Sequence, residues 1–302
     1  MRRPFLALLL LPCFVGACSG TGWRSVTPQD RSEIRPQPDG ARTTHWNEMQ
    51  VAWENRGGGS EALVFVHGWG GDRSVWTKQL DGLGPWRRIA IDLPGHGASD
   101  KPRIDYNQDT LAGALLAVLD DAGIERAVLV GHSNGGVTVR HFLALHPERV
   151  AGLVLVDAPL EPLFASPAQG RAFVAPLSSS DWKEWAAKFA DTMLAPVHDA
   201  AERKHVRAVL LGTPQYVLRS SFEGTLDPAL WRKDPIGVPL MLLLAKQSAW
   251  EGDARARAEK IAPGLRWEML EGVSHFLMLD DPERTNALLR SFLLTQAPFA
   301  KR

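Results

Sequence analysis

The 302-residue chain is poor in cysteine and has no excess of charge of either sign. Its two cysteines, Cys13 and Cys18, lie near the N-terminus, so the rest of the sequence offers neither a disulfide framework nor a cysteine-based zinc site. The 34 Lys and Arg residues balance 34 Asp and Glu residues. A dedicated nucleic-acid-binding protein needs a basic surface, so this balance argues against nucleic acid as a partner. No strong metal-ligand cluster or phosphate-binding loop stands out in the sequence.

Long apolar runs are scarce as well. The run at residues 5–15 follows Arg2 and Arg3 and is interrupted by Pro12. It is too short to cross a hydrocarbon core of ~30 Å as a helix, and its basic flank is typical of a secretory signal. We find no further segment of the sequence that is long and apolar enough to span a membrane.

The apolar run ends in Val15-Gly16-Ala17-Cys18, which resembles the lipobox of bacterial lipoproteins. The resemblance implies that residues 1–17 are a signal peptide removed before Cys18, and that lipidation of Cys18 anchors the chain in a membrane of the cell envelope. Ser19 stands where an inner-membrane retention signal would place Asp, so in a host with two membranes the periplasmic face of the outer membrane is expected. The alternative is a plain signal peptide and a periplasmic or secreted protein.

Residues 18–43 are expected to form a flexible tether. Pro28, Pro36, Pro38 and Gly40 lie among polar residues there, and few apolar side chains are available for burial. The alternative is an ordered extension that packs on the domain that follows.

Short apolar runs alternate with helical patterns in the rest of the chain. Five runs are typical of strands buried on both faces, at residues 62–66, 89–91, 127–130, 153–156 and 240–244, and residues 265–270 fit a last core strand. The main helical patterns lie at residues 74–80, 108–121, 136–145, 252–261 and 282–294. This alternation predicts an α/β fold with a mostly parallel sheet and right-handed crossovers.

Residues 160–234 break the alternation, because they contain helical stretches but no clear buried strand. Several of their apolar side chains fall roughly on one helical face, which argues against a long loop: Trp182, Trp185, Phe189 and Leu194. We therefore predict a helical cap at residues 160–234, inserted into a core formed by residues 44–159 and 235–302.

The sequence Gly131-His132-Ser133-Asn134-Gly135 lies between the apolar run at residues 127–130 and a helical pattern. This G-x-S-x-G pattern, between a strand and a helix, indicates a strained turn that presents a serine hydroxyl. The glycines are needed because neighbouring backbone leaves no room for a Cβ. The helix N-terminus supplies N–H groups to a developing oxyanion. Ser133 is therefore the candidate nucleophile.

Together with that pattern, three further motifs make the chain resemble the α/β-hydrolase fold family over residues 45–302. They are His-Gly-Trp-Gly at 67–70, Asp-Leu-Pro-Gly-His-Gly-Ala-Ser at 92–99 and Gly-Val-Ser-His-Phe at 272–276. The resemblance implies an eight-stranded sheet, a nucleophile–acid–histidine triad and no cofactor. It also implies two oxyanion donors, the backbone N–H groups of Trp69 and Asn134, worth ~3 kcal/mol each.

The base and the acid of such a triad follow strands. His275 comes directly after the last predicted strand and is the expected general base. Most relatives place an Asp after the strand at residues 240–244, but Ser248 stands there in this chain. Some hydrolases of this fold, haloalkane dehalogenases among them, carry the acid at the end of the preceding strand, so the resemblance implies that Asp157, at the end of the strand at residues 153–156, is the acid. The alternatives are Asp253 or Glu251 from a longer loop, or no working acid.

A serine nucleophile points to acyl transfer to water. The sequence therefore predicts a hydrolase that cleaves a carboxylic ester, or a related acyl bond, of a small apolar substrate. Amidases and carbon–carbon bond hydrolases share this apparatus, and a non-catalytic binding protein on the same fold is the alternative from another class. The sequence does not predict the oligomeric state.

Overall fold

The computed structural model describes residues 39–195, 199–231, 234–246, 252–296 and 298–299, all within one compact unit. The expected signal peptide, Cys18 and most of the expected tether lie outside the described residues. Ser248 and Glu251 also lie outside them.

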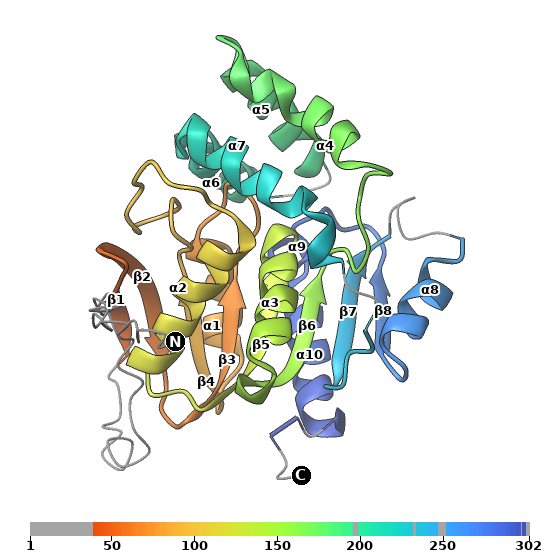
Figure 1. The fold of residues 1–302 in the computed structure, drawn as a ribbon. Helices are drawn as coiled ribbons and strands as arrows, with labels where there is room; N and C mark the ends of the chain where they lie inside the picture. The colour runs from red at the N-terminus through yellow and green to blue at the C-terminus, as the bar shows by residue number, and fades with distance from the viewer. Residues whose placement is uncertain (1–38, 196–198, 232–233, 247–251, 297, 300–302) are drawn as a thin grey trace, which may run out of the picture. The chain divides into compact units, whose positions relative to one another are not determined.

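An eight-stranded sheet forms the centre of the described structure, with the strand order β1-β2-β4-β3-β5-β6-β7-β8 (Figure 1). β2 is antiparallel to β1 and β4, and all pairs from β4 to β8 are parallel. The strands are β1 (Gly40–Trp46), β2 (Met49–Arg56), β3 (Glu61–Val66), β4 (Arg87–Ile91), β5 (Arg126–His132), β6 (Val150–Val156), β7 (Leu240–Ala245) and β8 (Arg266–Leu270). The predicted α/β fold with a mostly parallel sheet is confirmed.

The first strand corrects the C-terminal end of the expected tether. β1 begins at Gly40, so the last residues of the segment 18–43 belong to the sheet. Thr44 of β1 is buried and accepts a hydrogen bond of 2.8 Å from the indole N–H of Trp53 in β2. β1 is an edge strand that pairs on one side with β2, and its other residues are largely half-buried or exposed. Such a strand has no continuous apolar run to reveal it in the sequence.

Helices cover both faces of the sheet. On one face pack α2 (Gln108–Asp121), α3 (Asn134–Leu145) and α8 (Ala254–Ile261), and on the other α1 (Thr77–Gly82), α9 (Leu277–Asp280) and α10 (Pro282–Gln296). Successive residues of β3 serve opposite cores, because side chains alternate along a strand. Val64 and Val66 belong to the core beneath α2 and α3, and Leu63 and Phe65 to the core on the other face.

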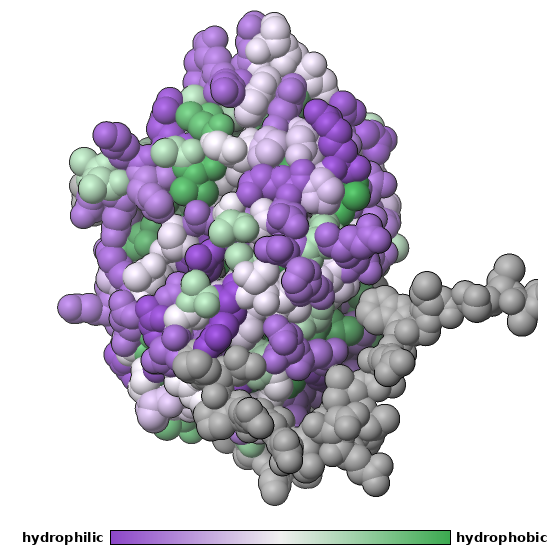
Figure 2. All heavy atoms as spheres, turned by 90° about the vertical axis from the view of Figure 1, so that its left-hand side faces the viewer, coloured by the Kyte–Doolittle hydropathy of each residue, from purple (hydrophilic) through white to green (hydrophobic). Residues whose placement is uncertain are grey.

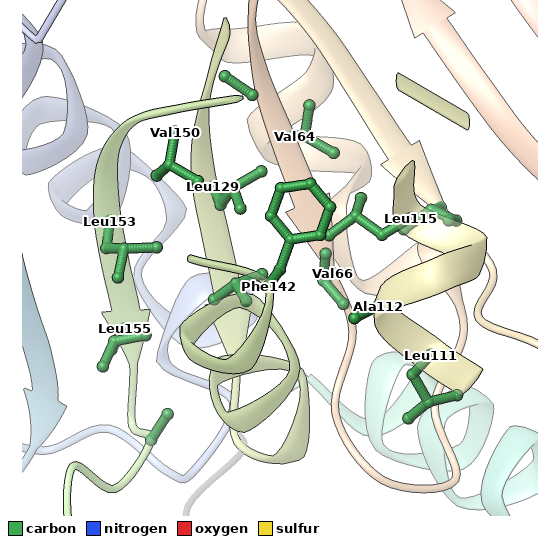
Figure 3. Packing of buried hydrophobic residues seen from close by; sticks show 14 of the residues in the cluster. Val64, Val66, Leu111, Ala112, Leu115, Leu129, Phe142, Val150, Leu153 and Leu155 are labelled. Atoms are coloured by element: carbon green, nitrogen blue, oxygen red, sulfur yellow. The ribbon is translucent and has the colours of Figure 1, made fainter. Parts of the chain in front are cut away.

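Phe142 of α3 lies within the first of these cores (Figure 3). Its side chain is fully buried and clusters with Val64, Leu129 and Leu115, which come from β3, β5 and α2. Burial of each such side chain stabilises the fold by about 1.5–3 kcal/mol. This packing fixes α3 against β5 and thereby fixes the turn that joins them.

In the described residues between β6 and β7, four α-helices lie above the carboxyl ends of the parallel strands in Figure 1. They are α4 (Pro167–Val174), α5 (Trp182–Met193), α6 (Ala200–Gly212) and α7 (Gln215–Glu223). Trp69, in the loop after β3, ties this cap to the core, because its indole N–H donates to the Leu218 carbonyl of α7 at 2.7 Å.

None of the helices described is both long and apolar enough to cross a bilayer. The face seen in Figure 2 is largely hydrophilic, with small and separate hydrophobic patches.

Candidate active site

The turn between β5 and α3 holds Ser133 in a strained conformation. Its φ of 52° and ψ of −121° lie outside the regions that L-residues ordinarily adopt. The glycines make this turn possible. A Cβ on Gly131 would lie 2.5 Å from the Gly135 carbonyl oxygen, and a Cβ on Gly135 would lie 2.4 Å from the His67 carbonyl oxygen. The turn therefore presents Ser133 directly at the N-terminus of α3.

Hydrogen bonds in the loop after β3 fix the orientation of the peptide group between Gly68 and Trp69. The Gly68 carbonyl accepts hydrogen bonds from His67 Nδ1 at 2.8 Å and from the Gly71 N–H at 3.1 Å. His67 Nε2 accepts from the Leu93 N–H at 3.0 Å, so the ring carries its proton on Nδ1. Because N–H and C=O point in opposite directions in a trans peptide, the Trp69 N–H points away from these contacts.

Two backbone N–H groups beside Ser133 have no hydrogen-bond acceptor in the described part of the chain. A Cβ on Gly68 would lie 3.0 Å from the Ser133 Cβ, so the loop lies against the nucleophile candidate. Among the described residues, no hydrogen-bond acceptor serves the Trp69 N–H. Asn134 is the first residue of α3, where the N–H has no intrahelical acceptor. These are the two predicted oxyanion donors.

Asp157 and His275 form a partly buried hydrogen-bonded pair. His275 Nδ1 lies 2.7 Å from Asp157 Oδ2, and the side chains are 17% and 2% exposed. The other carboxylate oxygen, Oδ1, accepts from the Ala245 N–H at 3.1 Å. Asp157 itself has a φ of 43° and its N–H donates to the Leu243 carbonyl at 2.8 Å. The strands β6 and β7 thus hold the carboxylate rigidly.

The alternative acids are placed differently. Asp253 precedes α8, its side chain is 73% exposed, and it forms an ion pair with Arg257. Glu251 lies outside the described residues, as does Ser248 at the position where relatives carry the acid.

His132 is a site residue that the sequence analysis did not single out. It ends β5, its Nε2–H donates to the His275 carbonyl at 2.9 Å, and the two imidazole rings lie 4.5 Å apart. Burial, together with the nearby His275, holds the pKa of His132 well below its ordinary value. A neutral imidazole therefore supports the backbone of His275. The signal was available in the sequence, because the strand places this residue directly beside Ser133.

A cavity of about 610 Å³ joins these groups beneath the cap. Ser133, His275, Trp69 and Asn134 line it on the core side. The remaining walls are mainly apolar and come from the cap and its connections: Pro159, Pro162, Leu163, Phe164, Phe189, Met193, Phe222, Leu226 and Trp231. Among the described lining residues, Lys246 alone carries a fixed charge, and its Nζ is 2.7 Å from Glu271 Oε1.

No group of three or more His, Cys, Asp or Glu side chains within the described ranges is placed to hold a metal ion.

Acid is expected to destabilise the fold through buried histidines. Burial lowers the pKa of His96 to about 3, and burial also lowers the pKa of His67 and His132. The unfolded chain therefore binds these protons near pH 6.5 while the folded chain does not, so stability falls as the pH drops below about 6.5. Each of these histidines lowers the free energy of unfolding by up to about 1.4 kcal/mol per pH unit below that value.

Urea denaturation at pH 7.5 and 5.5 measures this loss. The matched variant is His96→Asn, because Asn can replace the Nδ1 contact to the Pro94 carbonyl but does not titrate. This variant should lose less stability between the two pH values than the wild type. An equal loss in both proteins would contradict the assignment.

The protein-family model described as alpha/beta hydrolase fold matches residues 61–201 of this chain. An acetyltransferase component of an acetoin-cleaving system from Cupriavidus necator is 38% identical over 110 residues, which is 36% of this chain and 29% of that protein. A 2-hydroxy-6-oxononadienedioate/2-hydroxy-6-oxononatrienedioate hydrolase from Paraburkholderia phymatum is 40% identical over 119 residues, 36% of this chain and 40% of that protein. The chain thus spans less than half the length of these relatives.

A solved structure extends the similarity over most of the described chain. The esterase EaEST from Exiguobacterium antarcticum superposes with a TM-score of 0.75 at 21% identity, covering 83% of this chain and 98% of that one. The strand order, the strained turn after β5 and this superposition lead to one conclusion: the chain has the alpha/beta hydrolase fold.

Proposed function

We propose that the protein is a serine hydrolase that cleaves an ester of an uncharged, apolar substrate through an acyl-enzyme at Ser133. The observation that carries the proposal is the 2.7 Å contact between His275 Nδ1 and Asp157 Oδ2, at a cavity that Ser133 and His275 both line. With Nδ1 bound to the carboxylate, Nε2 is the ring nitrogen left to receive the Ser133 proton.

The chemistry proceeds in two halves. The Ser133 oxygen attacks the ester carbonyl while His275 takes its proton, and the N–H groups of Trp69 and Asn134 donate to the resulting oxyanion. Collapse expels the alcohol, which receives the proton from His275. A water molecule then attacks the acyl-enzyme with His275 again as the base, releasing the carboxylic acid and restoring Ser133. The sum is ester plus water to acid plus alcohol.

Aromatic rings from the cap favour an apolar substrate. Trp185 and Phe189 stack with ring centroids 5.4 Å apart, and Phe189 meets Trp69 edge-on at 5.6 Å. The ring of Phe222 also meets Trp69 edge-on, with the ring centroids 5.9 Å apart. Trp69 also carries one of the proposed oxyanion donors, so this aromatic wall lies beside the reacting carbonyl.

A series of 4-nitrophenyl esters of graded acyl length tests the substrate class. Each buried CH₂ contributes about 0.8 kcal/mol, or roughly fourfold, so kcat/KM for the hexanoate should exceed that for the acetate by at least tenfold. Phe189→Ala should lower kcat/KM for the hexanoate more than for the acetate. A preference for a 4-nitrophenyl ester that carries a free carboxylate would contradict an uncharged substrate.

Carbon–carbon bond hydrolysis is the second candidate, favoured by the similarity to the Paraburkholderia phymatum protein over 119 residues. The substrate in that protein's name is a dicarboxylate, which needs cationic partners when buried. Lys246 is the one fixed cation among the described cavity residues, and it is paired with Glu271. This favours the ester. Faster turnover of a 2-hydroxy-6-oxo-dienedioate than of any ester would reverse the order.

We also propose that Cys18 carries a lipid anchor, on the strength of the sequence Val15-Gly16-Ala17-Cys18. Cys18→Ser should release the protein from the membrane fraction of the producing bacterium or leave the signal peptide uncleaved. Fractionation followed by mass spectrometry of the N-terminal peptide measures both. Wild-type protein found free in the periplasm would show that the resemblance to a lipobox misleads.

A further inference from the structure

A chain of polar side chains runs from α2 through α3 to the cap. The Thr138 hydroxyl donates to Gln108 Oε1 at 2.7 Å, and Gln108 Nε2 donates to Asn134 Oδ1 at 3.0 Å. Asn134 Nδ2 then lies 3.4 Å from the Ser221 carbonyl oxygen of α7. Gln108, Thr138 and Ser221 are almost completely buried, at 2%, 0% and 0% exposure.

The direction of this hydrogen-bonded chain is set at its cap end. The Ser221 carbonyl can only accept, so Asn134 must turn its NH₂ group toward α7 and its Oδ1 toward Gln108. Gln108 must then turn its NH₂ group toward Asn134 and its oxygen toward the Thr138 hydroxyl. Each partner therefore has one allowed orientation.

Asn134 and Ser221, the two members of this hydrogen-bonded chain nearest the cap, each adjoin a functional part of the cavity. Asn134 follows Ser133 and supplies one proposed oxyanion donor. Phe222, next to Ser221, belongs to the aromatic wall. The end of α7 also packs closely on the start of α2, because a Cβ on Gly224 would lie 2.8 Å from the Asn107 Cα. Backbone packing therefore also fixes the position of α7 relative to the N-terminus of α2.

Resting on the proposed hydrolase function, we propose that Gln108 is a positioning residue for the reaction. It holds the Asn134 side chain between α3 and α7, and thereby fixes the orientation of the Asn134 N–H toward the oxyanion and the position of the Phe222 wall relative to Ser133. Neither Gln108 nor Thr138 lines the cavity, so both act through Asn134.

Kinetics of three variants test this role. Gln108→Leu and Thr138→Val each break the chain, and misplacement of a donor by a fraction of an ångström costs about tenfold. Both variants should lower kcat about tenfold and leave KM for a short ester within about twofold. Thr44→Val is the matched control, because it removes another buried, hydrogen-bonded hydroxyl on the distant edge strand β1 and should leave kcat unchanged.

Gln108→Glu gives a readout that loss of packing would not give. A protonated Glu can still donate to Asn134 Oδ1 and accept from Thr138, whereas an ionised Glu repels Asn134 Oδ1. The ratio of its kcat to that of the wild type should therefore fall as the pH rises from 5 to 9. The same ratio for Gln108→Leu should stay constant.

The outcomes separate the inference from the function on which it rests. Full kcat in Thr138→Val and a pH-independent ratio in Gln108→Glu, with Ser133→Ala inactive, would overturn the positioning role alone. Full activity in Ser133→Ala would overturn both. If Gln108→Leu fails to fold, Thr138→Val and Gln108→Glu still decide the matter.

Discussion

Ser133→Ala and His275→Ala are each expected to lower kcat for ester hydrolysis by a factor on the order of 10⁵–10⁶. The alanine at 133 has no oxygen to acylate, and the alanine at 275 leaves no base to accept the proton. Because the members of a triad act as a unit, the double variant should be little worse than either single one. Steady-state kinetics on folded, monodisperse protein measure the loss.

A second serine–histidine pair provides the matched control. The Ser74 hydroxyl lies 2.8 Å from His205 Nε2, where the short 3-10 helix Arg73–Trp76 meets α6, and neither residue lines the cavity. Ser74→Ala should leave kcat within about twofold. Equal losses in Ser74→Ala and Ser133→Ala would show that the assay reports folding rather than chemistry.

Asp157→Asn is expected to lower kcat by up to ~10⁴-fold. In the wild type, both carboxylate oxygens accept from N–H donors, Oδ1 from Ala245 and Oδ2 from His275. An Asn has one oxygen, and the Ala245 N–H cannot change its role. The amide NH₂ would then face His275 Nδ1, so the ring would carry its proton on Nε2 and could not accept one from Ser133.

Asp253→Asn is the control for this change. Asp253 is exposed and paired with Arg257, so its loss should alter kcat by less than about twofold. Glu251→Gln should behave in the same way. A large loss in either of these variants, together with near-normal activity in Asp157→Asn, would return the acid to the loop after β7.

The sequence predicted β3 to β7 because these strands contain continuous apolar runs, whereas β8, which includes Arg266 and Glu268, was expected from its place before His275. The pattern for α2 coincides with the helix at Gln108–Asp121, and the run at residues 240–244 lies within β7. β1 and β2 had no such signal, since β1 is largely half-buried or exposed and β2 mixes polar residues with its buried apolar ones. The start of β1, at the edge of the sheet, was therefore predicted to belong to the tether.

Some residues of the candidate site belong to local sequence motifs, whereas other contacts in the site join distant parts of the chain. Motifs at Ser133 and His275 are local in the sequence, and the structure places both residues on one cavity. The partner of His275 is not local, because Asp157 is 118 residues away and reaches it only through the strand order β6-β7-β8. The link from Gln108 to Asn134 joins two helices and had no sequence motif to announce it. Contacts of this kind depend on tertiary packing.

Labelling with a fluorophosphonate probe tests most directly whether Ser133 is an activated nucleophile. The phosphorus should bond to the Ser133 oxygen with loss of fluoride, which requires the neighbouring base and oxyanion donors of the folded site. Intact-mass and peptide mass spectrometry should show one adduct on Ser133 in the folded wild type and none in Ser133→Ala or in denatured protein. Folded wild-type protein that stays unlabelled, or an adduct that persists in Ser133→Ala, would contradict the account.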